Sequence, residues 1–571
     1  MPRTWLFPST ATSVRRTLSQ ALDLSELTAQ VLANRGIDTV TSARSFLSPR
    51  LTDLHDPDAM QDMPRACERV AKAVRDRERI VVYGDYDVDG LAATALLVKL
   101  FELLRANARA FVPNRLTDSY SITPEGARRV IETGADLVIA VDNGTTAIEG
   151  VETLARSGID VIVTDHHLPG PELPPAFAVV NPRRPDCPYP FKELSGVGVA
   201  FKLAWGVARI LSQGTRVTAR LREFLQYATA WTALGTVADV VPLVNENRVL
   251  VKYGLPLLAQ APSPGLRALC QTSRLGQTIT AEDVGFRLAP RLNAAGRMGL
   301  TNLALDLLLA DSDEKARPIA LKLEELNEKR RAIEQAIVCE ALEVVEHHHR
   351  DDAVLVLARE NWHAGVIGVV ASRLVEALGK PVFMISLSDG RGKGSARTVA
   401  GFHLHQALSR CDDLLLTYGG HAAAAGLELE AHRVPALRER LNEVARELSA
   451  EDLQPTLAID AEIPLAAVTL RLLAELDRLA PFGEGNSPPV FASSTLKLVE
   501  PPRTVGTGGD HLQLRVAQGS TVMKAIAYGM GGRAAALTKA SSLQLAYAPR
   551  IDAYRGNRAI ELQVLDMRTE V

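Results

Sequence analysis

The chain has 571 residues, of which 47% are hydrophobic and 23% charged, and its formal net charge is −3. This composition excludes disordered and fibrous proteins, and the length predicts about three or four domains. The small net charge argues against a chain that coats nucleic acid over its whole surface, although a local basic channel would not show in the sum. Five scattered cysteines without a CxxC pair argue against disulfides or a structural zinc site and predict a reducing, cytoplasmic location.

The amino-terminal part carries no chemistry that its sequence reveals. MPRTWLFPSTATSVRR lacks the apolar segment of a secretory signal, and no run of about 18 apolar residues predicts a membrane helix anywhere in the chain. We therefore expect no membrane contact. Residues 1–75 are predicted to be mostly helical, and we expect them to pack on the first domain.

From residue 79 onward, short apolar strands alternate with helices such as 124–133 and 147–157. This alternation predicts a parallel sheet with helices on both faces, whose sites lie beyond the carboxyl ends of the strands. The predicted strands are Ile80–Tyr83, Ala110–Val112, Leu137–Val141, Val161–Thr164 and Ala178–Val180.

Acidic residues follow the first of these strands, in the sequence IVVYGDYDVDG. If the strand geometry persists, Asp85, Asp87 and Asp89 lie on one side, because strand side chains alternate with period two. Clustered carboxylates repel one another unless cations lie between them, and oxygen ligands favour Mg²⁺ or Mn²⁺. The alternative is a solvated acidic turn.

Two further strand ends carry similar groups. Asp142 follows the strand 137–141, and Asp165, His166 and His167 follow the strand 161–164. One aspartate after a strand is usually a turn former or a helix cap, and adjacent histidines are usually exposed. Three such ends in one domain nevertheless favour a divalent-metal site.

The motifs GDYDVDG, VDNG and TDHH, in this order, resemble the DHH phosphoesterase superfamily. That superfamily includes RecJ exonucleases, oligoribonucleases, cyclic-dinucleotide phosphodiesterases and pyrophosphatases. SGVGVAFKL at 195–203, LGTVADVVPL at 234–243 followed by ENRVLVKYG, and PRLNAAGRM at 290–298 resemble its RecJ branch. The resemblance extends from about residue 79 to the end of the chain.

The resemblance implies two Mg²⁺ or Mn²⁺ ions with ligands at Asp87, Asp89, Asp142, His166 and Asp239. Asp142 and Asp239 are expected to bridge the ions, and the alternative for Asp239 is a pair with a core arginine. Asp85 is expected to shape the turn or to assist from behind the ligands. Tyr83 stands where relatives carry an outer-metal ligand, which implies an open position on that ion.

Two further residues of the TDHH motif have expected catalytic roles. Asp165 is expected to orient His166. His167 is expected to contact the scissile phosphate or to protonate the leaving oxygen.

A third group of residues is implied to hold the phosphates of the substrate. Each would more often be an ion-pair or loop residue, but arginine forks and glycine-rich segments suit phosphate. The resemblance implies that the phosphates contacted by Ser395, Arg397 and His421 include the 5′-terminal phosphate. The full set is Arg115, Arg291, Asn293, Arg297, Ser395, Arg397 and His421.

The expected fold class is α/β with a C-terminal β-barrel. Residues 76–310 would form the DHH domain, 311–350 a connecting helix, 351–450 a small DHH-associated α/β domain, and 455–571 an OB-fold. The barrel is expected to bind single strands through basic and aromatic side chains, and a protein-interaction barrel is the alternative. These side chains are Lys497, Arg503, Arg515, Lys524, Tyr528, Tyr547 and Arg550.

The resemblance implies a 5′→3′ exonuclease specific for single-stranded DNA that releases 5′ mononucleotides in recombination and repair. It also implies a single-strand-binding protein and a helicase as partners. One alternative is a phosphodiesterase for short oligonucleotides or cyclic dinucleotides, whose members generally lack the long helix and the barrel. The other is an inactive repair or replication scaffold, against which the complete ligand set argues.

Overall fold

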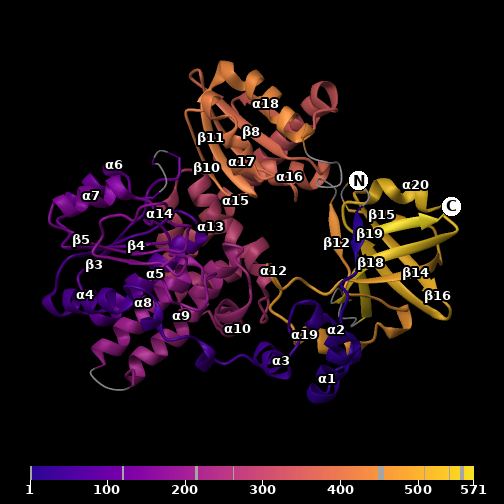
Figure 1. The fold of residues 1–571 in the computed structure, drawn as a ribbon, viewed down its shortest axis with the longest axis horizontal. Coiled ribbons are helices and arrows are strands. Elements are labelled where there is room, and N and C mark those ends of the chain that lie inside the picture. The colour runs from indigo at the N-terminus through magenta and orange to yellow at the C-terminus, as the bar shows by residue number, and fades with distance from the viewer. Residues whose placement is uncertain are drawn as a thin grey trace. The chain divides into compact units, whose positions relative to one another are not determined.

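The computed structural model describes residues 3–116, 118, 121–212, 216–261, 263–447, 455–506, 508–538, 540–552 and 559–570. The chain forms two compact units. One comprises Leu51–Leu453 with Gly483–Gly485 and contains the expected metal ligands. The other comprises Met1–Arg50, Gln454–Phe482 and Asn486–Val571. Figure 1 traces the chain from indigo to yellow.

The first unit is built on a parallel five-stranded sheet in the order β3-β2-β4-β5-β6. Its central strands are buried on both faces, as near-continuous apolar sequence predicts for a parallel sheet. Alternate residues face two separate cores: Ile80 and Val82 lie in one, Val81 and Tyr83 in the other. The strands are β2 (Ile80–Tyr83), β3 (Ala108–Phe111), β4 (Leu137–Val141), β5 (Asp160–Thr164) and β6 (Ala178–Val180).

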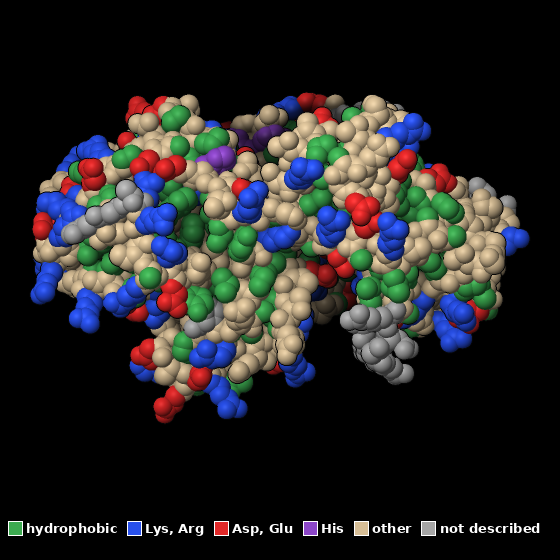
Figure 2. Space-filling model, turned by 90° about the horizontal axis from the view of Figure 1, so that it is seen from below, with side chains coloured by type: hydrophobic (Ala, Val, Ile, Leu, Met, Phe, Trp, Pro, Cys, Tyr) green, Lys and Arg blue, Asp and Glu red, His purple; other side chains and the backbone are tan. Residues whose placement is uncertain are grey.

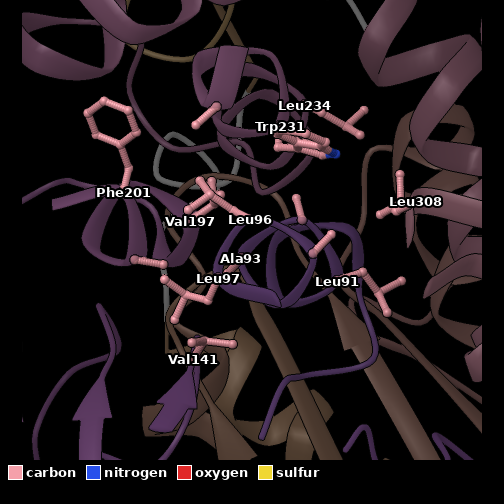
Figure 3. Close-up of a cluster of buried hydrophobic side chains, with 14 of the residues drawn as sticks. Leu91, Ala93, Leu96, Leu97, Val141, Val197, Phe201, Trp231, Leu234 and Leu308 are labelled. Atoms are coloured by element: carbon pink, nitrogen blue, oxygen red, sulfur yellow. The ribbon is translucent and has the colours of Figure 1, made fainter. Parts of the chain in front are cut away.

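Helix α5 (Val88–Leu104) lies at the centre of the larger core. Its sequence LAATALLVKLF is apolar on nearly every side, which is typical of a fully buried helix. Figure 3 shows Leu97 of α5 near Val141 of β4, with side chains of α8, α9 and α14 around the rest of the helix. This packing fixes the start of α5, where the acidic motif lies.

Other helices complete the part of the unit around the parallel sheet. They are α4 (Met63–Asp76), α6 (Pro124–Ile131), α7 (Ile148–Arg156), α8 (Gly196–Leu211), α9 (Ala219–Ala238), α10 (Asn245–Gln260), α11 (Pro264–Thr272), α12 (Ala281–Asp283), α13 (Ala289–Arg297) and α14 (Thr301–Leu309).

Helix α15 (Asp313–Val344) is the long helix expected over 311–350, and its last part becomes a π-helical turn, Val345–His349. It does not cross open space. Its first half packs on the larger core beside the parallel sheet through Ala320 and Leu323, and its second half packs in another core through Ile337 and Ala341. One rigid element therefore joins the two cores.

The second sheet of this unit has five strands of mixed direction in the order β10-β11-β9-β8-β7. The segment 391–397, RGKGSAR, is strand β9, and the segment 419–426, GGHAAAAG, forms the end of β10, a turn and the start of β11. The elements are β7 (Leu355–Glu360), α16 (Ile367–Leu378), β8 (Val382–Ser388), β9 (Arg391–Arg397), α17 (Leu404–Ser409), β10 (Thr417–Gly420), β11 (Ala424–Glu430) and α18 (Val434–Arg446).

The other unit contains a closed barrel. Its strands follow the order β14-β18-β19-β17-β16, and pairing of β14 with β16 closes the ring. The elements are β12 (Thr456–Ala458), β13 (Ala461–Glu462), α19 (Leu470–Asp477), β14 (Phe491–Leu498), β15 (Arg503–Val505), β16 (His511–Gln518), β17 (Thr521–Ala527), α20 (Ala534–Leu537), β18 (Ser542–Asp552) and β19 (Ala559–Glu570).

The amino-terminal segment corrects one expectation. Strand β1 (Thr4–Leu6) pairs with β12, and helices α1 (Thr12–Leu22), α2 (Glu26–Asn34) and α3 (Val40–Leu47) pack in the core of the barrel unit. Residues from about 51 to 75 belong to the unit of the parallel sheet, where α4 contacts α8 and β6. An amphipathic stripe shows that a helix must be covered, but not by which sheet.

The surface is of mixed charge. On the face drawn in Figure 2, cationic and anionic side chains are interspersed, in keeping with the net charge of −3. Within the described part of the chain, no helix combines the length and the apolar character needed to cross a membrane.

Candidate metal centre and phosphate site

The acidic motif after β2 is a strand-to-helix turn and does not continue the strand. Asp87 is the N-cap of α5, and its Oδ1 accepts hydrogen bonds from the backbone amides of Asp89 (2.9 Å) and Gly90 (3.1 Å). Asp89 lies in the first turn of the helix. The expected period-two arrangement is therefore wrong, because capping offers these carboxylates a better use of the free helix amides.

Tyr83 offers no ligand to the cluster, and the open position on the outer ion stays a prediction. It belongs to the strand face that points into the smaller core, stacks on Phe111 at 5.0 Å between ring centroids, and donates a hydrogen bond to the carbonyl of Ser121. Burial is the main reason why its pKa is raised. Tyr83 is close to the carboxylates in sequence, but because strand side chains alternate between the two faces of the sheet, its side chain points away from them.

Asp89 is held by a second helix. Its two carboxylate oxygens accept hydrogen bonds from the backbone amides of Gly196 (2.7 Å) and Val197 (3.0 Å) at the start of α8. Glycine is required opposite it, since a Cβ at Gly235 of α9 would lie 2.6 Å from Asp89 Oδ1. Asp89 therefore links the starts of α5 and α8 with α9.

The expected ligands converge at the carboxyl edge of the sheet. His166 Nε2 lies 3.2 Å from Asp142 Oδ1 and 3.5 Å from Asp239 Oδ2. Three sets of residues each offer ligand atoms within 4.8 Å of one another. They are Asp85, Asp87 and Asp142; Asp89, His166 and Asp239; and Asp142, His166 and His167.

The electrostatics of this cluster favour a bound cation. Burial, and then repulsion by neighbouring carboxylates, raises the pKa of Asp89 to about 7 and of Asp239 to about 9, and raises the pKa values of Asp85 and Asp142 well above the usual range. A divalent ion removes this penalty by pairing with the ionised forms.

Two observations test whether the residues fit Mg²⁺ or Mn²⁺. Asp85 Oδ1 is buried without a hydrogen-bond partner among the described residues, as expected of an atom reserved for a cation or its water. Burial, and then the charge of His167, lowers the pKa of His166 to about 3, so its imidazole is neutral and able to ligate. Carboxylates with one imidazole suit these ions, so the residues fit.

Asp165 and His167 form a pair beside the cluster. Asp165 Oδ1 lies 2.7 Å from His167 Nδ1. The carboxylate of Asp165 also accepts hydrogen bonds from the backbone amides of His166 and Thr145. Burial opposes the charge on His167, but the hydrogen bond with Asp165 and the charges of Asp165 and nearby carboxylates together outweigh it and raise the pKa to about 9. Asp165 therefore orients the ring of His167, and the expectation that it orients the ring of His166 is wrong.

An arginine cluster lies in the same unit. Burial, and then repulsion from Arg115 and from further arginines including Arg397, lowers the pKa of Arg297. Arg397 donates to Ser395 Oγ (3.2 Å), and Arg297 donates to the carbonyl of Gly365 (3.0 Å) just before α16. Cations that repel one another at a buried site favour the binding of an anion, and phosphate suits arginine forks.

The other expected phosphate residues are placed differently. Asn293 lies one turn before Arg297, with its Oδ1 buried and unpartnered among the described residues. His421 lies between β10 and β11 with much of its side chain exposed, and partial burial, followed by the charges of His167 and Arg183, lowers its pKa. Arg291 instead pairs with Glu324 of α15, and the structure does not bring it to the cluster.

Sequence reasoning missed two groups. Arg183, held by Glu193 and by the carbonyl of Lys192, lies close enough to His166, Asp239 and His421 to influence their pKa values. Arg330 and Glu334 form a buried pair on α15 beside Arg297. The only sequence signal for Arg183 was its place shortly before the matched motif at 195–203.

The barrel surface also differs from expectation. Tyr547 is fully buried and bonds to Ser493 Oγ, so it cannot stack on a base. Lys524 and Arg550 both pair with Glu561, whereas Tyr528 is 47% exposed and contacts Arg550. Lys497, Arg503 and Arg515 are exposed.

Comparisons with known proteins agree with this arrangement. Family models match at residues 79–230 (DHH family, N-terminal domain), 351–447 (DHHA1 domain) and 459–566 (RecJ OB domain). The single-stranded-DNA-specific exonuclease RecJ of Dickeya dadantii is 36% identical over 560 residues, which cover 95% of this chain and 96% of that protein. The chain belongs to the RecJ family.

Other RecJ proteins give the same picture. RecJ of Bacillus subtilis is 36% identical over 96% of this chain and 69% of its own length. The crystal structure of Thermus thermophilus RecJ in complex with Mn²⁺ matches with a TM-score of 0.85 and 32% identity, over 100% of this chain and 80% of that one. A structure of exonuclease RecJ bound to manganese matches 71% of this chain and 98% of its own, with a TM-score of 0.60. The α/β fold with a C-terminal barrel is thus confirmed.

Proposed function

We propose that this RecJ-family chain is a metal-dependent exonuclease that degrades single-stranded DNA from its 5′ end to 5′ mononucleotides. One observation carries the proposal: buried carboxylates and a neutral imidazole converge at the sheet edge, and a cluster of mutually repelling arginines lies in the same unit. The first set suits divalent cations and the second suits phosphate, the two requirements of phosphodiester hydrolysis.

Asp87, Asp89, Asp142, His166 and Asp239 would hold two Mg²⁺ or Mn²⁺ ions. Asp142, which belongs to two of the three ligand sets, suits a bridging position. Asp85 would contact an ion or one of its waters. Bound ions supply an activated water and neutralise charge on the phosphoryl group.

His167 would act on the leaving group. Water adds to the phosphorus, the P–O3′ bond breaks, and the departing O3′ needs a proton. The imidazolium that Asp165 stabilises holds such a proton at Nε2, since Nδ1 faces Asp165. The first nucleotide leaves with a 3′ hydroxyl, and the shortened strand keeps a 5′ phosphate.

The arginine cluster would set the polarity. Arg115, Arg297, Arg397 and Ser395 would hold the 5′-terminal phosphate while the next phosphate lies at the metals. His421 and Asn293 would contact the same strand. Arg291 is left out of this set, because its guanidinium is bound to Glu324.

The barrel would bind single-stranded DNA further along the strand through exposed Lys497, Arg503, Arg515 and Tyr528. A single-strand-binding protein and a helicase stay predicted partners. The five cysteines are all free, which fits the proposed cytoplasmic location.

The test is hydrolysis of a long 5′-labelled single strand beside its duplex, with Mn²⁺ or with EDTA. We expect labelled mononucleotides only from the single strand, and only when Mn²⁺ is present. Asp142→Asn should lower the rate of hydrolysis by at least about a thousandfold. Equal cleavage of the duplex, or activity in EDTA, would refute the proposal. Preference for dinucleotides or cyclic dinucleotides would instead support the phosphodiesterase alternative, and a folded but inactive protein would support the scaffold.

A further inference from the structure

Val240, the residue directly after Asp239, has an unusual backbone. Its φ is +60°, in the left-handed region that β-branched residues strongly disfavour. Among the described non-glycine residues with positive φ, only Val240 and Thr495 are β-branched. The chain must turn sharply here, because α9 ends at Ala238 and Val241 and Leu243 are buried again. Glycine or asparagine would make this turn with less strain.

Packing of the Val240 side chain within the described part of the fold does not compensate for this strain. It is 65% exposed and belongs to none of the hydrophobic clusters of the described residues. A lone exposed valine is ordinary on a protein surface. An exposed valine in a left-handed turn is unusual, because a residue that adopts this backbone conformation more easily would make the fold more stable.

The position suggests what the side chain does. Consecutive Cα atoms are about 3.8 Å apart, so Val240 is at the edge of the metal centre to which Asp239 belongs. If the phosphate of a nucleotide binds at Asp239 and His166, the sugar and base of that nucleotide would lie near the residue that follows Asp239. Both present apolar faces, which an exposed branched side chain can cover.

We propose that Val240 is a substrate-contacting residue, whose apolar side chain packs on the sugar or base of the nucleotide at the metal centre. The inference rests on the proposed function and adds one residue to it. It predicts that Val240 contributes to binding of the DNA strand and not to binding of the metal.

The experiment compares Val240→Gly, Val240→Asn and Val240→Ile with the wild-type full chain. The substrate is a 5′-phosphorylated 20-nucleotide single strand. The readouts are thermal unfolding, kcat and KM with Mn²⁺, Mn²⁺ affinity, and anisotropy of the labelled strand in EDTA. Ala261→Gly is the control, because it places glycine at another left-handed position of the same unit, at the end of α10.

We expect Val240→Gly and Val240→Asn to raise the Tm by about 2–4 °C, as relief of strain requires. Both should raise KM and the Kd for the strand about five- to tenfold through loss of apolar contact, with kcat and Mn²⁺ affinity little changed. Val240→Ile should keep the wild-type KM, and Ala261→Gly should leave KM unchanged.

An unchanged KM in Val240→Gly and Val240→Asn would overturn the inference, and so would weaker Mn²⁺ binding without a change in Kd for the strand. Failure of the proposed function looks different. The wild-type chain would then not hydrolyse the strand at all, while the Kd values in EDTA would still show whether Val240 contacts it.

Discussion

At the scale of single residues, the site depends on carboxylates that the fold forces together. Asp85, Asp89, Asp142 and Asp239 have raised pKa values because burial and mutual repulsion favour their protonated forms. Their ionised forms suit a divalent cation. Proton and metal therefore compete for the same oxygens.

This competition predicts a pH-dependent stabilisation by Mg²⁺. Between the unfolded pKa near 3.8 and the folded values of about 7 for Asp89 and 9 for Asp239, the folded metal-free protein binds more protons than the unfolded chain. The contribution of these groups to the free energy of unfolding of the metal-free protein therefore falls as pH rises through that window. Added Mg²⁺ should raise the Tm far more at pH 8.5 than at pH 6.

The measurement is thermal unfolding with Mg²⁺ or EDTA across that range. Asp142→Asn is the control, and its Mg²⁺-dependent shift should be small at every pH. A shift in the wild-type chain that is the same at pH 6 and pH 8.5 would contradict the competition.

At the scale of elements, helix starts and close glycine contacts position the ligands. Asp87 caps α5, Asp89 accepts hydrogen bonds from the first backbone amides of α8, and Gly235 lets α9 approach Asp89. The first contact is local to α5, whereas the other two join elements that are distant in sequence. The geometry of the site is thus a consequence of how α5, α8 and α9 pack.

Gly235→Ala tests this packing. Alanine suits a helix better than glycine, but its Cβ would lie 2.6 Å from Asp89 Oδ1 and 2.8 Å from Val197 Cγ1. Because α8 amides hold the carboxylate, we expect a loss of about 1–3 kcal/mol in the free energy of unfolding. Mn²⁺ affinity, measured by titration calorimetry, should fall about tenfold or more.

Gly276→Ala is the matched control, since its Cβ would meet nothing within 4 Å. It should leave stability and Mn²⁺ affinity near the wild-type values. If Gly235→Ala behaved in the same way, Asp89 would not be fixed by the approach of α9.

At the scale of the whole molecule, the chain leaves one unit and returns to it. Residues 1–50 and the segment after residue 454 share one core, and the catalytic unit lies between them in sequence. The contacts include Glu475 Oε2, which accepts hydrogen bonds from the Ser25 amide and hydroxyl and from the Thr28 hydroxyl. The two units should therefore unfold in separate transitions.

Leu32→Ala tests this division, because Leu32 is fully buried in the barrel unit. We expect a loss of about 2–5 kcal/mol confined to one calorimetric transition. That transition should not respond to Mn²⁺, whereas the transition of the catalytic unit should.

Leu97→Ala, in the core around α5, is the reciprocal variant and should lower only the Mn²⁺-responsive transition. If Leu32→Ala lowered the Mn²⁺-responsive transition instead, residues 1–50 would stabilise the catalytic domain, as the sequence led us to expect.

The sequence by itself determined which elements form and where chemistry collects. Apolar runs defined β2, β4 and β6 to the residue, and the motifs after three strands named every residue of the ligand sets except Asp239, which the resemblance to the RecJ branch supplied. Both follow from local patterns, since strand periods and the rule for parallel sheets need no knowledge of distant packing.

Only the tertiary structure decided what depends on contacts between distant segments. It turned Tyr83 into the smaller core, gave Arg291 to Glu324, buried Tyr547, and placed α1–α3 on the barrel unit. It also showed that Asp89 is held by α8 and that Val240 makes a strained turn beside the metal centre. A sequence pattern shows that a side chain must be buried or paired, but its partner is chosen by the packing of the whole chain.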